Sequence, residues 1–121
     1  HFMMKEIHEQ PKALQDTLNS VVRDGVIQRF EFTTELAWKA AREYLLDQGY
    51  TEINSPKAVM RQAYADGLIT DQSGWLKLLE DRNLTSHIYN DATAGEIFQR
   101  IGANHLALFQ ALSKQLTGVE R

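Results

Sequence analysis

The stretch VIQRFEFTTELAWKAAREYLLDQ, residues 26–48, decides the fold class of this chain. Its polar side chains recur at spacings of three and four residues, as they do on one face of an α-helix. They are Gln28, Glu31, Glu35, Lys39 and Arg42. Apolar side chains fill most of the remaining circumference, an arc wider than the ~100° that a surface helix needs. The stretch therefore predicts a helix that is central in a bundle or that contacts a second chain.

The residues on either side of this stretch also favour helices. Only two prolines and seven glycines interrupt the 121 residues, and no alternating β-type pattern stands out. A first helix is expected over residues 11–23, followed by a break or a tight crossing at Gly25. Gly49 occupies the place where a left-handed residue ends a helix. These signals predict two separate helices before residue 50.

Helix caps divide the second half of the chain. Ser55 and Pro56 suit the N-cap and first turn of a third helix, and Gly67 suits its end. Asp71 or Ser73 can cap a fourth helix that contains Trp75. A last helix is expected after a break at residues 90–91, where Thr93 and Glu96 have capping-box spacing. These signals together predict an all-α fold.

Length and composition suit a single globular domain over residues 1–121, with His1 and Phe2 read as a remnant outside the native sequence. The net charge of −3 argues against a surface that grips many phosphates, so any RNA contact should be local. The chain has no cysteine, no zinc-type spacing and no phosphate-binding glycine loop, and we expect no metal or cofactor of its own. We also expect no signal peptide, no membrane contact and a cytoplasmic location.

The segment DRNLTSHIYN, residues 81–90, carries the side chains best suited to chemistry. Arg82 offers a fixed fork of donors for a phosphate, and His87 could move a proton to or from a ribose 2′-hydroxyl near neutral pH. On an ideal helix these two side chains diverge by roughly 140°. They can converge only if the helix ends between them or if two copies face each other, so the chemistry predicts a homodimer.

Spacing alone favours a plainer interpretation of this segment. An arginine and a histidine near a helix end commonly cap carbonyl groups or join surface ion pairs. The remaining candidates are weaker still. His105 lies on an apolar stripe and is expected to be a satisfied core or interface histidine, and Trp38 and Trp75 are expected to fill core or interface.

Two stretches resemble a known family. Residues 26–39, VIQRFEFTTELAWK, are similar to the signature helix of the nucleotidyltransferase substrate-binding proteins. Arg82 to Tyr89 matches the HEPN pattern of arginine, four residues, histidine, one residue and tyrosine. The likeness covers about residues 14–116. It implies a HEPN-like, antiparallel four-helix bundle with an additional short helix. Such a protein forms a homodimer and associates with a minimal nucleotidyltransferase encoded nearby.

The resemblance also implies roles for single residues. Arg82 and His87 would be the catalytic pair of a metal-independent ribonuclease toxin, and Asn83 would orient His87 or the phosphate. Tyr89 would be the residue that the transferase inactivates by nucleotidylation. Four polar residues of the signature helix would face solvent or a partner, namely Gln28, Arg29, Glu31 and Glu35.

Two other hypotheses stay open. The chain could be a non-catalytic subunit that presents a nucleotide or substrate, with ATP bound through the transferase. It could also be a helical dimerisation module whose polar segment only ends a helix.

Overall fold

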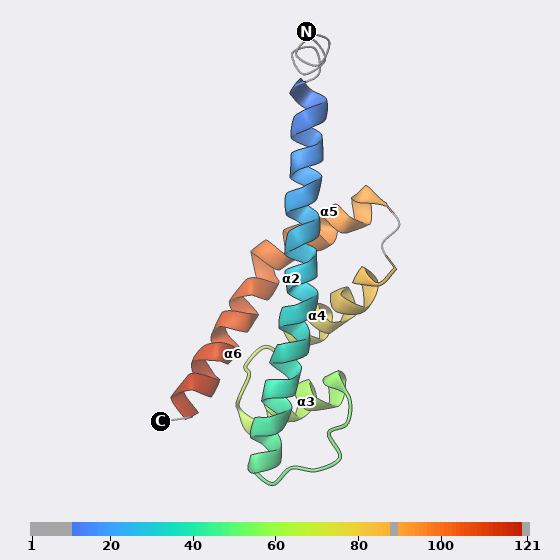
Figure 1. The fold of residues 1–121 in the computed structure, drawn as a ribbon. Helices are drawn as coiled ribbons and strands as arrows, with labels where there is room; N and C mark the ends of the chain where they lie inside the picture. Colours follow the sequence, from blue (N-terminus) through green and yellow to red (C-terminus); the bar gives the residue numbers. More distant parts are fainter. Residues whose placement is uncertain (1–10, 88–89, 120–121) are drawn as a thin grey trace.

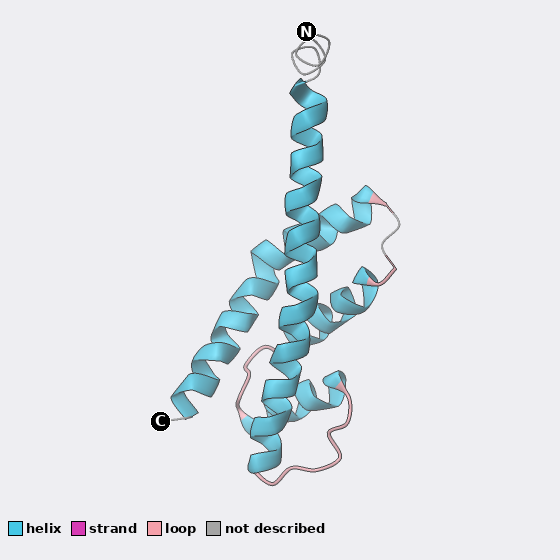
Figure 2. Cartoon of the chain, viewed as in Figure 1, coloured by secondary structure: helices cyan, strands magenta, loops and turns pink. Residues whose placement is uncertain are grey.

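The computed structural model describes residues 11–87 and 90–119, and every described regular element is helical (Figure 2). The elements are α2 (Pro11–Asp47), α3 (Pro56–Asp66), α4 (Gln72–Thr85), α5 (Asp91–Arg100), the π-helical segment η1 (Ile101–His105) and α6 (Leu106–Val119). Because α5, η1 and α6 follow one another without a gap, they form one continuous rod that bends between α5 and α6 (Figure 1). The fold is thus made of four rods, which confirms the all-α prediction (Figure 1).

The long helix α2 is the axis of the fold, and the other helices pack along it from its middle to its C-terminal end (Figure 1). The break predicted near Gly25 is wrong, because α2 runs through this residue. A glycine inside a helix costs about 1 kcal/mol relative to alanine, which weakens the helix without ending it. The predicted end is confirmed, since Gly49 has a φ of 97°. The predicted first and second helices are therefore one.

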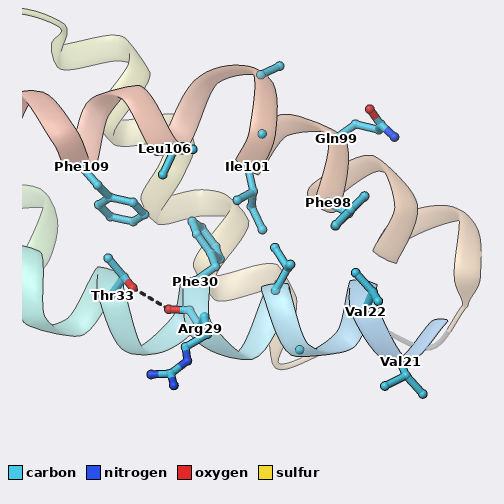
Figure 3. Close-up of a pocket in the computed structure, with 14 residues that line it drawn as sticks. Val21, Val22, Arg29, Phe30, Thr33, Phe98, Gln99, Ile101, Leu106 and Phe109 are labelled. Atoms are coloured by element: carbon cyan, nitrogen blue, oxygen red, sulfur yellow. Dashed lines mark hydrogen bonds between the residues drawn. The ribbon is translucent and has the colours of Figure 1, made fainter. Parts of the chain in front are cut away.

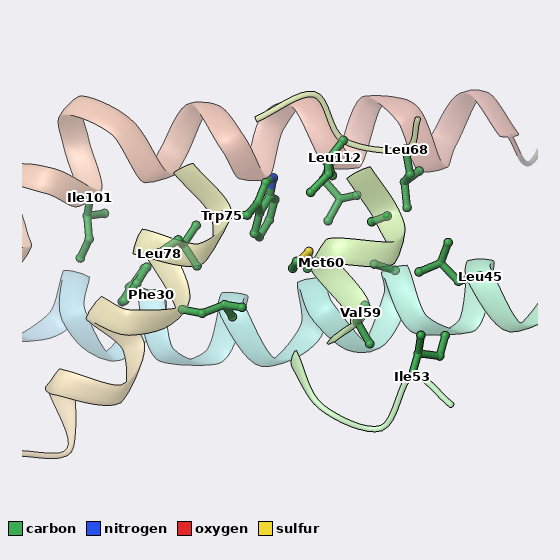
Figure 4. Close-up of a cluster of buried hydrophobic side chains, with 14 of the residues drawn as sticks. Phe30, Leu45, Ile53, Val59, Met60, Leu68, Trp75, Leu78, Ile101 and Leu112 are labelled. Atoms are coloured by element: carbon green, nitrogen blue, oxygen red, sulfur yellow. The ribbon is translucent and has the colours of Figure 1, made fainter. Parts of the chain in front are cut away.

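The direction of the rods departs from the predicted antiparallel bundle. α4 runs back along α2, whereas α6 runs beside α2 in the same direction (Figures 1 and 4). α4 is therefore antiparallel to both α2 and α6, whereas α2 and α6 are parallel.

Caps explain where the shorter helices begin and end. The Ser55 hydroxyl accepts a hydrogen bond from the Ala58 amide at 3.2 Å, and Gly67 ends α3 with a φ of 92°. Of the two alternatives for α4, the structure selects Asp71, whose Oδ1 accepts from the Gly74 amide at 2.9 Å. These caps satisfy amide groups that a helix start leaves without a partner.

The start of α5 differs from the prediction. Asn90, predicted to lie in a break, is the N-cap, and its Oδ1 accepts from the Thr93 amide at 2.8 Å. Thr93 is consequently the third residue of the helix. An asparagine side chain can both interrupt one helix and cap the next. The capping-box spacing of Thr93 and Glu96 suggested a later start for this helix, so the capping role of Asn90 was not predicted.

A single apolar core joins the rods (Figure 4). Trp75 is its largest fully buried side chain, and Phe30 contributes the α2 face opposite Leu78 and Ile101. Trp75 therefore fills core, as predicted. Trp38 is half-buried and packs against the edge of the same cluster.

Candidate functional site

The candidate site lies at the C-terminal end of α4. The helix ends at Thr85, Ser86 caps it, and the His87 amide donates to the Leu84 carbonyl at 2.9 Å. Arg82 is therefore in the last helical turn, and His87 lies beyond the helix. This early end meets one of the two conditions under which Arg82 and His87 could serve one phosphate.

Arg82 faces α2. Its Nη1 lies 3.4 Å from Oε2 of Glu31, and its Nε lies 3.9 Å from Oε1 of Glu35. Nη1 also donates to the Thr85 hydroxyl at 3.3 Å. The Thr85 hydroxyl oxygen in turn lies 3.0 Å from Oε2 of Glu31. About a quarter of the Arg82 side chain, 26%, stays exposed.

The charges around Arg82 nearly cancel. Two carboxylates face one guanidinium, and Lys39 lies 4.0 Å from the far oxygen of Glu35. The indole Nε1 of Trp38 donates to that same oxygen at 3.2 Å. An anion that approaches Arg82 therefore meets a nearly neutral cluster, in line with the weak phosphate contact expected from the net charge.

The other predicted site residues lie at the surface or outside the described residues. Asn83 and His87 are both exposed. The Asn83 carbonyl accepts from the Ser86 hydroxyl at 2.8 Å, so its main chain helps to end the helix. Tyr89 lies outside the described residues. The structure thus ties Arg82 to α2 and leaves the amide and the imidazole facing solvent.

A second charged cluster begins one residue earlier. Asp81 is fully buried, and its carboxylate accepts two hydrogen bonds from the Arg100 guanidinium, each 2.8 Å long. Its Oδ2 also lies 2.7 Å from Nε2 of His105. Because a carboxylate only accepts hydrogen bonds, Nε2 of His105 is the donor. His105 is 1% exposed and stacks on Phe30, so the predicted core placement is confirmed. It is not fully satisfied, because its buried Nδ1 has no hydrogen-bond partner among the described residues.

The environment of Asp81 explains its ionisation. Burial would raise the pKa of this carboxyl, but the hydrogen bonds from Arg100 and His105 more than offset that effect and hold the pKa below its usual value. The same contact raises the pKa of Arg100. The cluster is therefore an ionic link between α4 and the α5–η1–α6 rod.

The π-helical segment brings His105 to this link. In η1 the Leu106 amide donates to the Ile101 carbonyl, five residues back. Such a wide turn accommodates one residue more than a regular helical turn and appears mostly as a single-turn bulge. Ile101 and His105, one at each end of the segment, are both buried.

An apolar groove of about 740 Å³ lies between the first half of α2 and the long C-terminal rod. Figure 3 shows Val22 and Phe30 on α2 across the groove from Phe98, Ile101 and Phe109. The adjoining turns of α2 expose a stripe of large apolar side chains. These are Leu14, Leu18, Val21 and Val22, which we call the α2 stripe.

Four participants in these clusters were not predicted from the sequence, namely Glu31, Glu35, Asp81 and Arg100. Glu31 and Glu35 were expected to face solvent or a partner, but both face Arg82. The only sequence signal was the spacing of four residues between these two glutamates on the polar stripe. Nothing in the sequence shows that this stripe faces a helix about 50 residues later. Asp81 stands in the sequence only as the first residue of the polar segment, and nothing in the sequence pairs it with Arg100.

Comparisons with known proteins bear on this site. The sequence matches the family described as "Nucleotidyltransferase substrate binding protein like" over residues 3–118. This chain belongs to that family. Because the match covers nearly the whole chain, it confirms the resemblance drawn from residues 26–39 and 82–89.

Individual relatives agree with the family. The chain is 35% identical over 99 residues to a "Probable ribonuclease HepT" of Haemophilus influenzae, a match that covers 76% of this chain and 63% of that protein. A solved structure from Thermus thermophilus is 40% identical, with a TM-score of 0.69, and covers 84% of this chain and 82% of its own.

A second solved structure has the same fold. HI0074 of Haemophilus influenzae is 32% identical with a TM-score of 0.70, over 94% of this chain and 84% of its own. That structure is described as revealing the fold of a substrate binding domain of a nucleotidyltransferase. The nucleotidyltransferase substrate-binding family is thus shown by both sequence and fold.

Two features are absent from the described part of the chain. Within residues 11–87 and 90–119, no helix is long and apolar enough to cross a membrane. In the same residues, no three histidine or carboxylate side chains gather in a way that could hold a metal ion.

Proposed function

We propose that this member of the nucleotidyltransferase substrate-binding family is a HEPN-type ribonuclease that works beside a minimal nucleotidyltransferase. The observation that carries the proposal is that α4 ends at Thr85, between Arg82 and His87. The imidazole is thereby released from the helical geometry that would turn it away from the guanidinium. The name of the Haemophilus relative, probable ribonuclease, supports the same activity.

The proposed reaction is cleavage of RNA by internal transesterification. The ribose 2′-oxygen attacks the adjacent phosphorus while a base takes its proton, and the bond from phosphorus to the 5′-oxygen breaks as that oxygen gains a proton. The products are a 2′,3′-cyclic phosphate and a 5′-hydroxyl. Arg82 would bind the phosphate, His87 would move a proton, and Asn83 would orient one of them.

The reaction profits from both an acid and a base, whereas each chain offers one exposed histidine at this site. A homodimer would bring a second His87 to a shared groove. The α2 stripe and the adjoining apolar groove support such an assembly, because exposed apolar patches of this kind mark interaction surfaces.

Control by the partner would act on Tyr89. In the proposed step the phenol oxygen attacks the α-phosphate of ATP, pyrophosphate leaves, and the phenol proton is lost. The new phosphate would add negative charge two residues from His87 and compete with RNA for Arg82.

RNA cleavage by the purified protein tests the proposal. The wild-type chain should cut RNA, and His87→Ala and Arg82→Ala should each lower the rate by about 10²–10⁴, the usual contribution of an acid–base group. Glu43→Gln, an exposed change on α2, is the control and should cut at the wild-type rate. Cleavage that survives both site substitutions would refute the proposal.

A second candidate is a non-catalytic subunit that presents a nucleotide or acceptor to the transferase. The near-neutral surroundings of Arg82 favour it, as does the description of HI0074 as a substrate binding domain. Calorimetry with ATP, in the presence and absence of the transferase, distinguishes the candidates. Binding of ATP without any RNA cleavage would favour this subunit over the ribonuclease.

The simplest alternative is a dimerisation module whose polar segment only ends α4. A mass increase of one nucleotide on Tyr89, after incubation with the transferase and ATP, would exclude it.

A further inference from the structure

We propose that Glu31 is a positioning residue that sets the Arg82 guanidinium for the reacting phosphate, an inference that rests on the proposed ribonuclease function. Glu31 belongs to α2, and Arg82 belongs to α4. The contact between them therefore fixes a site residue from a different helix, 51 positions earlier in the chain. The proposed reaction uses no residue of the polar stripe in residues 26–48, and the contact gives one of them, Glu31, a role.

One carboxylate oxygen of Glu31 holds two groups of the site. Oε2 lies 3.4 Å from Nη1 of Arg82 and 3.0 Å from the Thr85 hydroxyl oxygen. The same hydroxyl accepts from Nη1 at 3.3 Å and lies 2.6 Å from the Arg82 carbonyl oxygen. Glu31, Thr85 and Arg82 thus form a closed ring of contacts that ties the arginine side chain to its own helix end.

This ring determines which edge of the guanidinium faces outward. Nη1 is engaged by Glu31 and Thr85. Nε is buried and has no hydrogen-bond partner among residues 11–87 and 90–119, with Glu35 3.9 Å away. Nη2 makes no hydrogen bond within that same part of the chain. A phosphate would therefore be met through Nη2, in an orientation that Glu31 sets.

The same carboxylate has an opposite effect on binding. A negative charge close to Arg82 lowers the attraction of that arginine for a phosphodiester. Glu31 should therefore support the chemical step and slightly oppose RNA binding. A residue that only stabilises the fold would show neither effect, and a residue that binds RNA would show the reverse.

Glu35 has a smaller part in this arrangement. Its contact with Arg82 is longer than that of Glu31, and its other oxygen is engaged by Lys39 and Trp38. Substitution of Glu35 should consequently change cleavage less than substitution of Glu31.

Steady-state cleavage of a short RNA tests the role. Glu31→Gln keeps the size of the side chain and an oxygen for Thr85 but removes the charge. We expect kcat to fall about tenfold while KM stays the same or falls, because the arginine is misplaced and the repulsion is gone. Glu31→Asp should recover part of kcat. Glu43→Gln makes the same charge change at an exposed site of α2 and should change neither constant.

Arginine side-chain NMR gives a readout that needs no activity. In the wild-type chain the Nη signals of Arg82, assigned with Arg82→Lys, should be separate because rotation of the guanidinium is restrained. They should merge in Glu31→Gln and stay separate in Glu43→Gln.

The two measurements separate the two proposals. A wild-type chain that leaves RNA intact, yet shows Arg82 signals that depend on Glu31, would refute the ribonuclease and leave the positioning contact. Arg82 signals that are the same in Glu31→Gln, or a KM that rises while kcat is unchanged, would overturn the role of Glu31.

Discussion

Asp81 and Arg82 are neighbours on α4, yet each pairs with charges on a different rod of the fold. Asp81 binds Arg100 and His105 in the interior, whereas Arg82 lies against Glu31 and Glu35 of α2 at the surface. The helical rotation of ~100° between successive residues separates the two side chains. One turn of α4 therefore carries both an internal ionic link and the candidate phosphate-binding group.

The internal link should be important for stability. Asp81→Asn removes the charge that compensates Arg100 and leaves a buried polar group with altered partners. We expect the free energy of unfolding to fall by about 3 kcal/mol, the lower end of the range for breaking a buried ion pair. Urea unfolding at neutral pH measures the change. Glu43→Gln should leave the midpoint in place, and an equally small change in Asp81→Asn would contradict the role of the link.

The stabilisation from Asp81 should depend on pH in a defined direction. The folded pKa of Asp81 lies below its usual value of 3.8. Its contribution is therefore fully present above the unfolded pKa and is lost as the pH falls through the folded pKa. The stability difference between the wild-type chain and Asp81→Asn should be constant near neutral pH and should narrow below about pH 4. A difference that stays constant into strong acid would show that the charge of Asp81 is not what stabilises the fold.

The α2 stripe should mediate self-association. Val21 is 64% exposed and Leu18 is 50% exposed, so aspartate at either position disturbs little within one chain. We expect Leu18→Asp and Val21→Asp to shift the protein from dimer to monomer in analytical ultracentrifugation, with the unfolding midpoint measured in parallel. Tyr64→Asp, at a 50% exposed position on α3, is the matched control and should remain dimeric. A dimer that persists in both stripe variants would place the interface elsewhere.

Two glycines should respond oppositely to the same substitution. Gly25 lies inside α2, and a Cβ atom there would meet nothing within 4 Å. Gly25→Ala should therefore stabilise the chain by about 0.5–1 kcal/mol. Gly49 has a φ of 97°, where a side chain is strained, so Gly49→Ala should destabilise it by a similar amount. Thermal unfolding of both variants checks the pair, and two shifts of the same sign would contradict these assignments.

The sequence was most informative where physical signals are local. The caps Ser55 and Asp71 and the helix ends at Gly49 and Gly67 follow from single residues and their immediate neighbours, and the structure confirms them. The break predicted near Gly25 is wrong because the low helix propensity of one glycine is a small effect beside the continuous hydrogen bonding of a long helix.

Only part of the candidate site could be predicted from the sequence, because some of its contacts join residues that are far apart in the chain. Arg82 and His87 stand close together in sequence, so the polar segment drew attention to them. Glu31 and Arg100 reach Arg82 and Asp81 only through the tertiary fold, and no short-range spacing reports such a contact. The family match adds the fold and the family, and it leaves the roles of these charged pairs to experiment.

The π-helical segment has a consequence for the length of the chain. The wide turn absorbs one residue more than a regular helical turn, so the residues after it face as they would on a regular helix that is one residue shorter. If residues 101–105 formed an ordinary α-helix without losing a residue, everything after them would rotate by about 100° around the helix axis. Leu112, now buried, would then turn out of the interior. We therefore expect relatives that are one residue shorter in this segment to form a regular α-helix here and to keep the same face of their last helix against the core.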